Sequence, residues 1–153
     1  MWREGIMTHR ELCIIAAKYL KNKLECKYVV CELERVGESP DAFGFGSVPT
    51  ILVECKISRS DFLSDKNKLF RLYPEKGVGE ERYYLCPVGI IKELDLPEKW
   101  GLLYIDENKK ITEIVKPETQ EHNYREEIEL ICSIFRREGI SPKTFSYKKY
   151  KNL

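Results

Sequence analysis

The sequence has no long hydrophobic run and little net charge, and each absence excludes a class of protein. No stretch approaches the roughly 18 consecutive apolar residues of a membrane-spanning helix. The opening residues, MWREGIM, contain no apolar core of signal-peptide type, so we expect a cytoplasmic protein that is neither secreted nor inserted into a membrane. The 26 basic and 25 acidic residues leave a formal net charge of +1, which by itself indicates no particular partner.

Cysteine is present, but its spacing is not that of a metal-binding knuckle. No C-x-x-C pair and no Cys/His cluster of zinc spacing occurs, so we expect neither a disulfide nor a structural zinc. Most of the cysteines lie in apolar runs, which favours reduced thiols acting as small hydrophobic residues. The six are Cys13, Cys26, Cys31, Cys55, Cys86 and Cys132.

The length and composition predict one folded domain followed by a basic tail. A chain of 153 residues with 42% hydrophobic and 33% charged residues suits a single domain with its own core, placed here at residues 1–142. Residues 143–153 contain four lysines and no acid. Lys148 and Lys149, which lie between Tyr147 and Tyr150, are therefore candidate contacts to single-stranded nucleic acid, although a solvated terminus is the simpler interpretation.

The order of the predicted elements is αβββαβ, followed by a hairpin and a helix. Thr8 and Glu11 form a capping box that begins the first helix. A second helix begins near Ser58 or Ser60 and continues to Tyr73, before Pro74 stops it. The strands are expected at residues 28–33, 41–45, 50–57 and 82–86, the hairpin at 102–105 and 111–116, and the last helix at 121–138.

The last helix carries an apolar stripe on one of its faces. The stripe has helical spacing, and Gly139 ends the helix behind it. Its members are Tyr124, Ile128, Ile131 and Phe135.

The third strand places charge where an apolar sheet is expected. Side chains alternate across a strand, so Glu54 and Lys56 share one face with Leu52. A hairpin with the preceding strand brings Asp41 beside Glu54. Two converging carboxylates repel each other unless a divalent cation lies between them. Two further acid-x-Lys triplets, beginning at Glu25 and Glu107, have no neighbouring strand that supplies such an Asp.

Carboxylates that hold a metal beside a lysine are typical of phosphodiester hydrolysis, and the surrounding residues resemble a known family. Pro40-Asp41 followed by Glu54-Cys55-Lys56 resembles the PD-(D/E)XK nuclease superfamily. The segments ILVECKISRSDF (51–62), RYYLCP (82–87) and WGLLYID (100–106) are similar to the MmcB-type DNA repair proteins. The resemblance covers roughly residues 28–116.

The resemblance implies a fold and a set of roles. The fold is the restriction-endonuclease-like α/β core, a mixed β-sheet of order αβββαβ flanked by helices, here extended by the C-terminal hairpin and helix. Asp41 and Glu54 would hold Mg²⁺ or Mn²⁺ together with the backbone carbonyl of Cys55, and Lys56 would be catalytic.

A further metal-ligating acid is expected from the element before Asp41. Glu32 and Glu34 share a face of the first strand and its extension, and Glu32 lies deeper in the apolar run. Glu32 is therefore the preferred candidate of the two.

The residues after the triplet have two interpretations each. Ser58 and Asp61 either support the metal ligands from behind or cap the second helix. Lys66, Lys68 and Arg71 of the second helix either contact phosphates or form an ordinary solvated face. His9 and His122 lie at polar helix starts, and we expect both to be exposed.

These observations predict a metal-dependent DNA endonuclease-like protein that hydrolyses phosphodiester bonds in DNA repair or processing. The first alternative is a non-catalytic DNA-binding or repair accessory module that retains the nuclease fold, which the near-neutral charge favours. The second is a structural or protein-interaction domain in which Lys56 merely pairs with Glu54. The sequence leaves open whether the protein forms a homodimer or uses a targeting partner protein.

Overall fold

The structure is a computed structural model that describes residues 7–140 of the chain. The predicted basic tail, with Lys148 and Lys149, lies outside the described residues.

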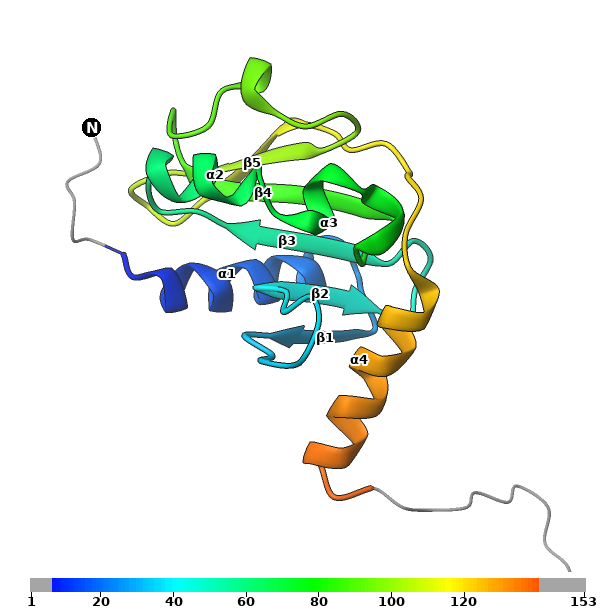
Figure 1. Ribbon diagram of the computed structural model, residues 1–153. Coiled ribbons are helices and arrows are strands. Elements are labelled where there is room, and N and C mark those ends of the chain that lie inside the picture. Colours follow the sequence, from blue (N-terminus) through cyan, green and yellow to red (C-terminus); the bar gives the residue numbers. More distant parts are fainter. Residues whose placement is uncertain (1–6, 141–153) are drawn as a thin grey trace, which may run out of the picture.

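Six strands form one mixed sheet, and their order in the sheet follows their order along the chain (Figure 1). Strands β1, β2 and β3 are antiparallel, β3, β4 and β5 are parallel, and β6 returns antiparallel to β5. This confirms the expected mixed α/β sheet flanked by helices. The strands are β1 (Tyr28–Cys31), β2 (Ala42–Phe45), β3 (Ile51–Cys55), β4 (Glu81–Pro87), β5 (Gly101–Ile105) and β6 (Ile111–Val115).

Helix α1 (His9–Asn22) begins at the predicted capping box and covers one face of the sheet. The backbone N–H of Glu11 donates to Thr8 Oγ1 at 3.2 Å, and that of Thr8 donates to the Glu11 carboxylate at 2.7 Å. The helix buries an apolar stripe against the face of β3 that carries Val53 and Cys55. The stripe consists of Leu12, Cys13, Ala16 and Leu20.

The opposite face of the sheet is covered by α2 (Arg59–Asp65), α3 (Leu69–Leu72) and α4 (Tyr124–Arg137) (Figure 1). Leu52 lies in this second core with Phe62 of α2 and Leu130 of α4. The predicted alternation of β3 is therefore confirmed, because its odd and even positions enter different cores. Two single-turn 3₁₀ helices complete the fold, η1 (Pro74–Lys76) and η2 (Glu93–Asp95).

The prediction of a single helix from Ser58 to Tyr73 is wrong, because the helix is interrupted after Asp65. Lys68 has extended backbone angles and separates α2 from α3. Residues six apart lie on different sides of a continuous helix, so an unbroken helix would keep Arg71 away from Asp65. The break lets Arg71 donate to the buried carboxylate of Asp65 at 2.8 Å.

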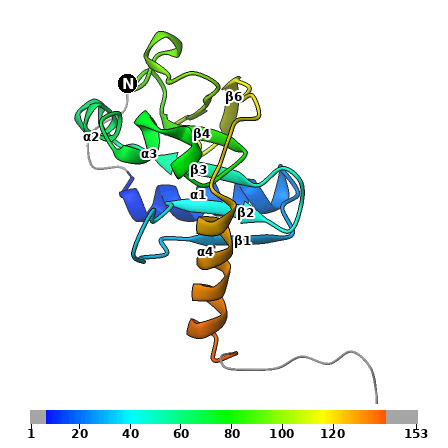
Figure 2. The same cartoon turned by 45° about the vertical axis from the view of Figure 1, so that its right-hand side comes forward.

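The apolar stripe of α4 is not the buried face of that helix. Tyr124, Ile128 and Phe135 are 66%, 60% and 45% exposed, whereas the helix turns Glu127 and Leu130 inward. Glu127 is held there because its carboxylate accepts hydrogen bonds from Thr50 and from the backbone of Gly79. The C-terminal part of α4 extends past the β1 edge of the sheet (Figure 2). Within residues 7–140, none of the helices combines the length and the apolar character needed to cross a bilayer.

Candidate active site at the ends of strands β2 and β3

Asp41 and Glu54 lie at the same level of the antiparallel pair β2 and β3. The antiparallel register pairs Ala42 with Val53, so Asp41, the residue before Ala42, lies opposite Glu54, the residue after Val53. The Asp41 carboxylate accepts a hydrogen bond from the backbone N–H of Cys55 at 2.8 Å. This bond holds Asp41 against β3, as the predicted hairpin requires.

Glu54 and Lys56 project side by side, as the alternation predicts. Lys56 Nζ lies 3.7 Å from Glu54 Oε2, and both side chains are more than nine-tenths buried. Lys56 Nζ also donates to Asp65 Oδ1 at 3.2 Å. The second interaction fixes the ammonium between two carboxylates.

Asp65 joins the site although the sequence did not single it out for a role there. Its carboxylate accepts hydrogen bonds from Tyr84 Oη at 2.6 Å and from Arg71 Nε at 2.8 Å, and Lys68 Nζ lies 2.9 Å away. Burial opposes its ionisation, but the charges of Arg71 and Lys56 and the bond from Tyr84 outweigh that effect and lower the pKa of Asp65. Asp65 is therefore an ionised anchor for the basic groups around it.

Arg71 is buried at the centre of this charge network. Its guanidinium contacts Glu38 at 3.0 Å and Glu54 at 3.3 Å, and it lies over the ring of Trp100 at 4.9 Å from the centroid. The expectation that Arg71 belongs to a solvated face is therefore wrong. Glu38, another acid that the sequence did not indicate, also accepts a bond from the backbone N–H of Val78 at 2.7 Å.

Glu54 is an acid whose ionisation the protein opposes. Complete burial raises its pKa to about 8 despite the nearby charge of Arg71, and the negative charges of Asp41 and Asp65 add to the effect. A further positive charge beside Glu54 would lower that pKa again.

Asp41 is paired with a histidine that we expected to be exposed and without a role. His9 Nε2 lies 3.3 Å from Asp41 Oδ2, and the hydrogen bond to Asp41 raises the pKa of His9 to about 10. Burial acts to raise the pKa of Asp41, but the bonds from His9 and Cys55 lower it. His122, interpreted in the same way, is buried and lies 2.9 Å from Glu127. No local pattern links the first turn of α1 to the start of β2.

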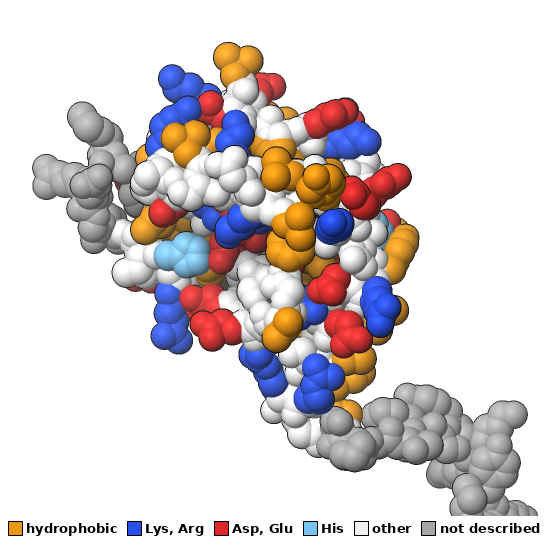
Figure 3. All heavy atoms as spheres, in the orientation of Figure 1, with side chains coloured by type: hydrophobic (Ala, Val, Ile, Leu, Met, Phe, Trp, Pro, Cys, Tyr) orange, Lys and Arg blue, Asp and Glu red, His pale blue; other side chains and the backbone are white. Residues whose placement is uncertain are grey.

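An open pocket of about 350 Å³ lies beside this charge network. Figure 3 shows a face of the molecule on which a histidine lies beside acidic and basic side chains. The pocket is lined by the buried side chains of Lys56 and Asp65 and by Lys68, whose side chain is 55% exposed. The remaining lining residues are His9, Cys55, Asp61 and Ser64.

The other predicted site residues take varied positions. Glu32 is exposed and lies 3.7 Å from Arg10, so its ion pair is with α1 and not with the Glu54 network. Ser58 caps α2 by accepting from the backbone N–H of Asp61 at 3.2 Å, which confirms the capping interpretation. Lys66 lies over the Phe62 ring at 5.6 Å and does not line the pocket.

Comparison with known proteins identifies the fold alone. No family model and no curated protein matches the chain. Among solved structures, it resembles the SPO1766 protein of unknown function from Silicibacter pomeroyi, with a TM-score of 0.63 and 19% sequence identity. The match covers 94% of this chain and 99% of that one, so the similarity extends over the whole domain.

Proposed function

We propose that this protein is a metal-dependent DNA endonuclease-like hydrolase of the PD-(D/E)XK type, acting on phosphodiester bonds in DNA repair or processing. One observation carries the proposal: Asp41, Glu54 and Lys56 converge at the ends of β2 and β3, beside an open pocket. The order of one helix, three antiparallel strands, a helical segment and a parallel strand supports the restriction-endonuclease-like assignment.

The donor groups suit a hard divalent cation. Asp41 and Glu54 offer carboxylate oxygens, and Mg²⁺ and Mn²⁺ prefer oxygen ligands. The raised pKa of Glu54 is what a carboxylate shows when its burial is only partly compensated, and a bound cation would complete the compensation. Asp41, Glu54 and the Cys55 carbonyl would hold the ion, which supplies charge stabilisation at a phosphate and acidifies a bound water.

The lysines provide the positive charge that a phosphate needs. Lys56 and Lys68 both line the pocket. A phosphate that enters the pocket offers Lys56 an acceptor in place of its present carboxylate partners. Lys56 would then stabilise the negative charge that develops on the phosphate during attack by water.

Cleavage assays with matched variants test this function. Supercoiled, linear and single-stranded DNA are incubated with the full chain in Mg²⁺, Mn²⁺ or EDTA. We expect cleavage that requires the metal. Lys56→Ala and Glu54→Gln should each reduce the cleavage rate at least about a hundredfold. Lys116→Ala, which changes an exposed residue, serves as the control and should leave cleavage unchanged. Cleavage that persists in both site variants would contradict the assignment.

A second candidate is the non-catalytic DNA-binding or repair accessory module. It is favoured because Arg71 and Lys56 already balance part of the charge on Glu54, and because acidic and basic side chains are mixed over the face in Figure 3. It predicts DNA affinity that falls with salt, with no turnover in any metal. Fluorescence anisotropy on the same substrates separates the two candidates.

A further inference from the structure

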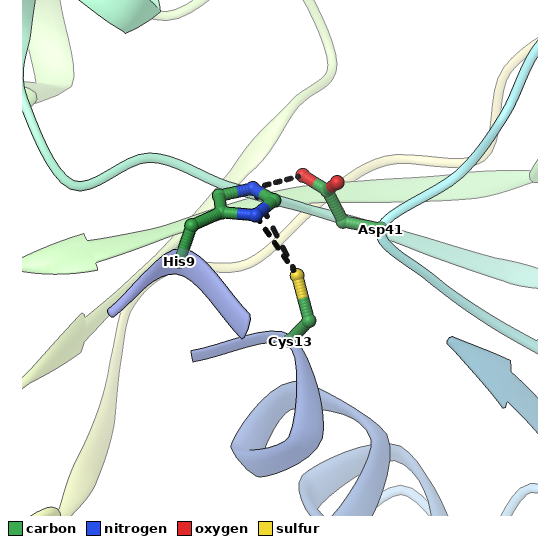
Figure 4. Close-up of side chains that lie close together, drawn as sticks. All are labelled: His9, Cys13 and Asp41. Carbon is green, nitrogen blue, oxygen red and sulfur yellow. Dashed lines mark hydrogen bonds and ion pairs between the residues drawn. The ribbon is translucent and has the colours of Figure 1, made fainter. Parts of the chain in front are cut away.

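A second group of metal-ligating side chains lies on the α1 side of Asp41 (Figure 4). His9 and Cys13 are four residues apart on α1, so both project from one side of the helix. That side faces the start of β2, where Asp41 stands. One donor atom from each of the three residues lies within 4.8 Å of the other two.

Two of the distances between these donors are close to the edges of a small coordination tetrahedron. Zinc bonds of about 2.0 Å to nitrogen and oxygen and 2.3 Å to sulfur give edges of about 3.3 Å for N to O and about 3.5 Å for N to S. His9 Nε2 lies 3.3 Å from Asp41 Oδ2 and 3.8 Å from Cys13 Sγ. The donor atoms of Cys13 and Asp41 also lie within 4.8 Å of each other, so side-chain movements of about 1 Å let the three residues share one ion.

We propose that His9 Nε2, Cys13 Sγ and Asp41 Oδ2 bind a zinc ion, with the fourth coordination position open toward the pocket. Imidazole nitrogen, thiolate sulfur and carboxylate oxygen together suit Zn²⁺, whereas Mg²⁺ is not bound by thiolates. The proposal shares Asp41 with the nuclease hypothesis but requires neither Glu54 nor Lys56.

The surroundings of the three residues provide access and a suitable charge. His9 is half-exposed and lines the pocket, which gives an ion a path to the buried sulfur of Cys13. A thiolate and a carboxylate together balance the two charges of the ion.

The sequence did not indicate this group, because its three residues do not form a zinc-binding motif. His9 and Cys13 alone do not make a zinc motif, and Asp41 comes from another element 28 positions after Cys13. The same contacts also describe a metal-free hydrogen-bonded cluster in which His9 is protonated and pairs with Asp41. Metal binding must be measured to distinguish the two.

Titration of the full-length chain with Co²⁺, after removal of metal with a chelator, provides a readout that is independent of activity. Co²⁺ replaces Zn²⁺ in such sites, and a bound thiolate produces an intense near-ultraviolet charge-transfer band. We expect the band to saturate at one equivalent and to disappear when Zn²⁺ is added. The band should be absent in Cys13→Ser, and affinity should fall at least about tenfold in His9→Gln.

Two controls make the result specific. Cys132→Ser removes a partly exposed thiol elsewhere and should leave the band unchanged. Lys56→Ala should also retain the band, so a loss of DNA cleavage does not count against the zinc site. Circular dichroism and thermal unfolding in EDTA establish whether the Cys13→Ser chain folds; if it does not, the half-exposed His9→Gln variant decides.

Three results would overturn the proposal: no thiolate band, a band that survives Cys13→Ser, or an affinity that His9→Gln does not change. Each would mean that the three side chains form only a hydrogen-bonded cluster.

Discussion

The guanidinium of Arg71 lies 3.3 Å from the Glu54 carboxylate, and both side chains are almost completely buried. Arg71 also contacts Asp65 and Glu38, so a single cation connects three buried acids from different parts of the chain. Removing one partner of a buried charge network leaves the others uncompensated, which costs more than the pair itself contributes. The candidate site is therefore also a stability element.

Replacing Arg71 by leucine should destabilise the fold by about 3–5 kcal/mol, because three buried carboxylates lose their shared partner. Urea denaturation followed by circular dichroism measures the loss. Arg59→Leu is the matched control, since Arg59 forms a bidentate pair with Asp95 at the surface, and its loss should be much smaller. Equal losses in the two variants would show that the Arg71 network contributes nothing special.

Glu54 should make the protein less stable as pH rises. Its folded pKa of about 8 exceeds the ordinary value of 4.5, so the folded state binds more protons than the unfolded state between these values. The free energy of unfolding should therefore decrease as pH rises through that window. Glu54→Gln should remove this decrease, and denaturation at about pH 5 and about pH 8 in EDTA compares the two proteins. An unchanged pH dependence in the variant would mean that Glu54 does not titrate there.

Mg²⁺ should stabilise the wild-type protein if Asp41 and Glu54 hold it, because a ligand that binds only the folded state raises the free energy of unfolding. At an ion concentration of 100 times the dissociation constant the gain is about 2.7 kcal/mol. Thermal unfolding at slightly alkaline pH, with and without Mg²⁺, measures the shift. Glu54→Gln should reduce it, whereas the exposed Lys116→Ala should not. A shift of the same size in Glu54→Gln would place the ion elsewhere.

His9 should titrate far above its ordinary range in metal-free protein. The bond to Asp41 raises its pKa from 6.5 to about 10, so its stabilising contribution is complete below pH 6.5 and is lost as pH rises toward 10. Because the ring is half-exposed, we expect a contribution of no more than about 1 kcal/mol. Proton NMR in EDTA measures the pKa of His9. The chain has one other histidine, His122, so the signal that disappears in His9→Gln is that of His9. A midpoint near the ordinary value would mean that the pair with Asp41 does not form in solution.

In helix α4, the periodicity of the sequence does not indicate which face is buried. Its stripe from Tyr124 to Phe135 has the spacing of a buried face, yet most of the stripe is exposed. The buried positions are Glu127, Leu130 and Ser133. The orientation depends on Glu127, which is bound by residues far away in the sequence. A sequence pattern records which side chains share a face, but not which face has partners.

Some features were determined by the sequence itself, because they depend on neighbours along the chain. The capping box at Thr8 begins α1, and the alternation from Ile51 to Lys56 sends apolar residues to both cores and brings Glu54 beside Lys56. Both features depend on fixed backbone geometry over a few consecutive residues, so they can be recognised in the sequence.

Only the tertiary structure decided the composition of the site around these residues. The break after Asp65, the arrival of Arg71 and the pairing of His9 with Asp41 each join segments that no local pattern connects. Burying a charge is unfavourable unless a partner meets it, so the positions of these groups follow from the whole network of charges within the folded domain.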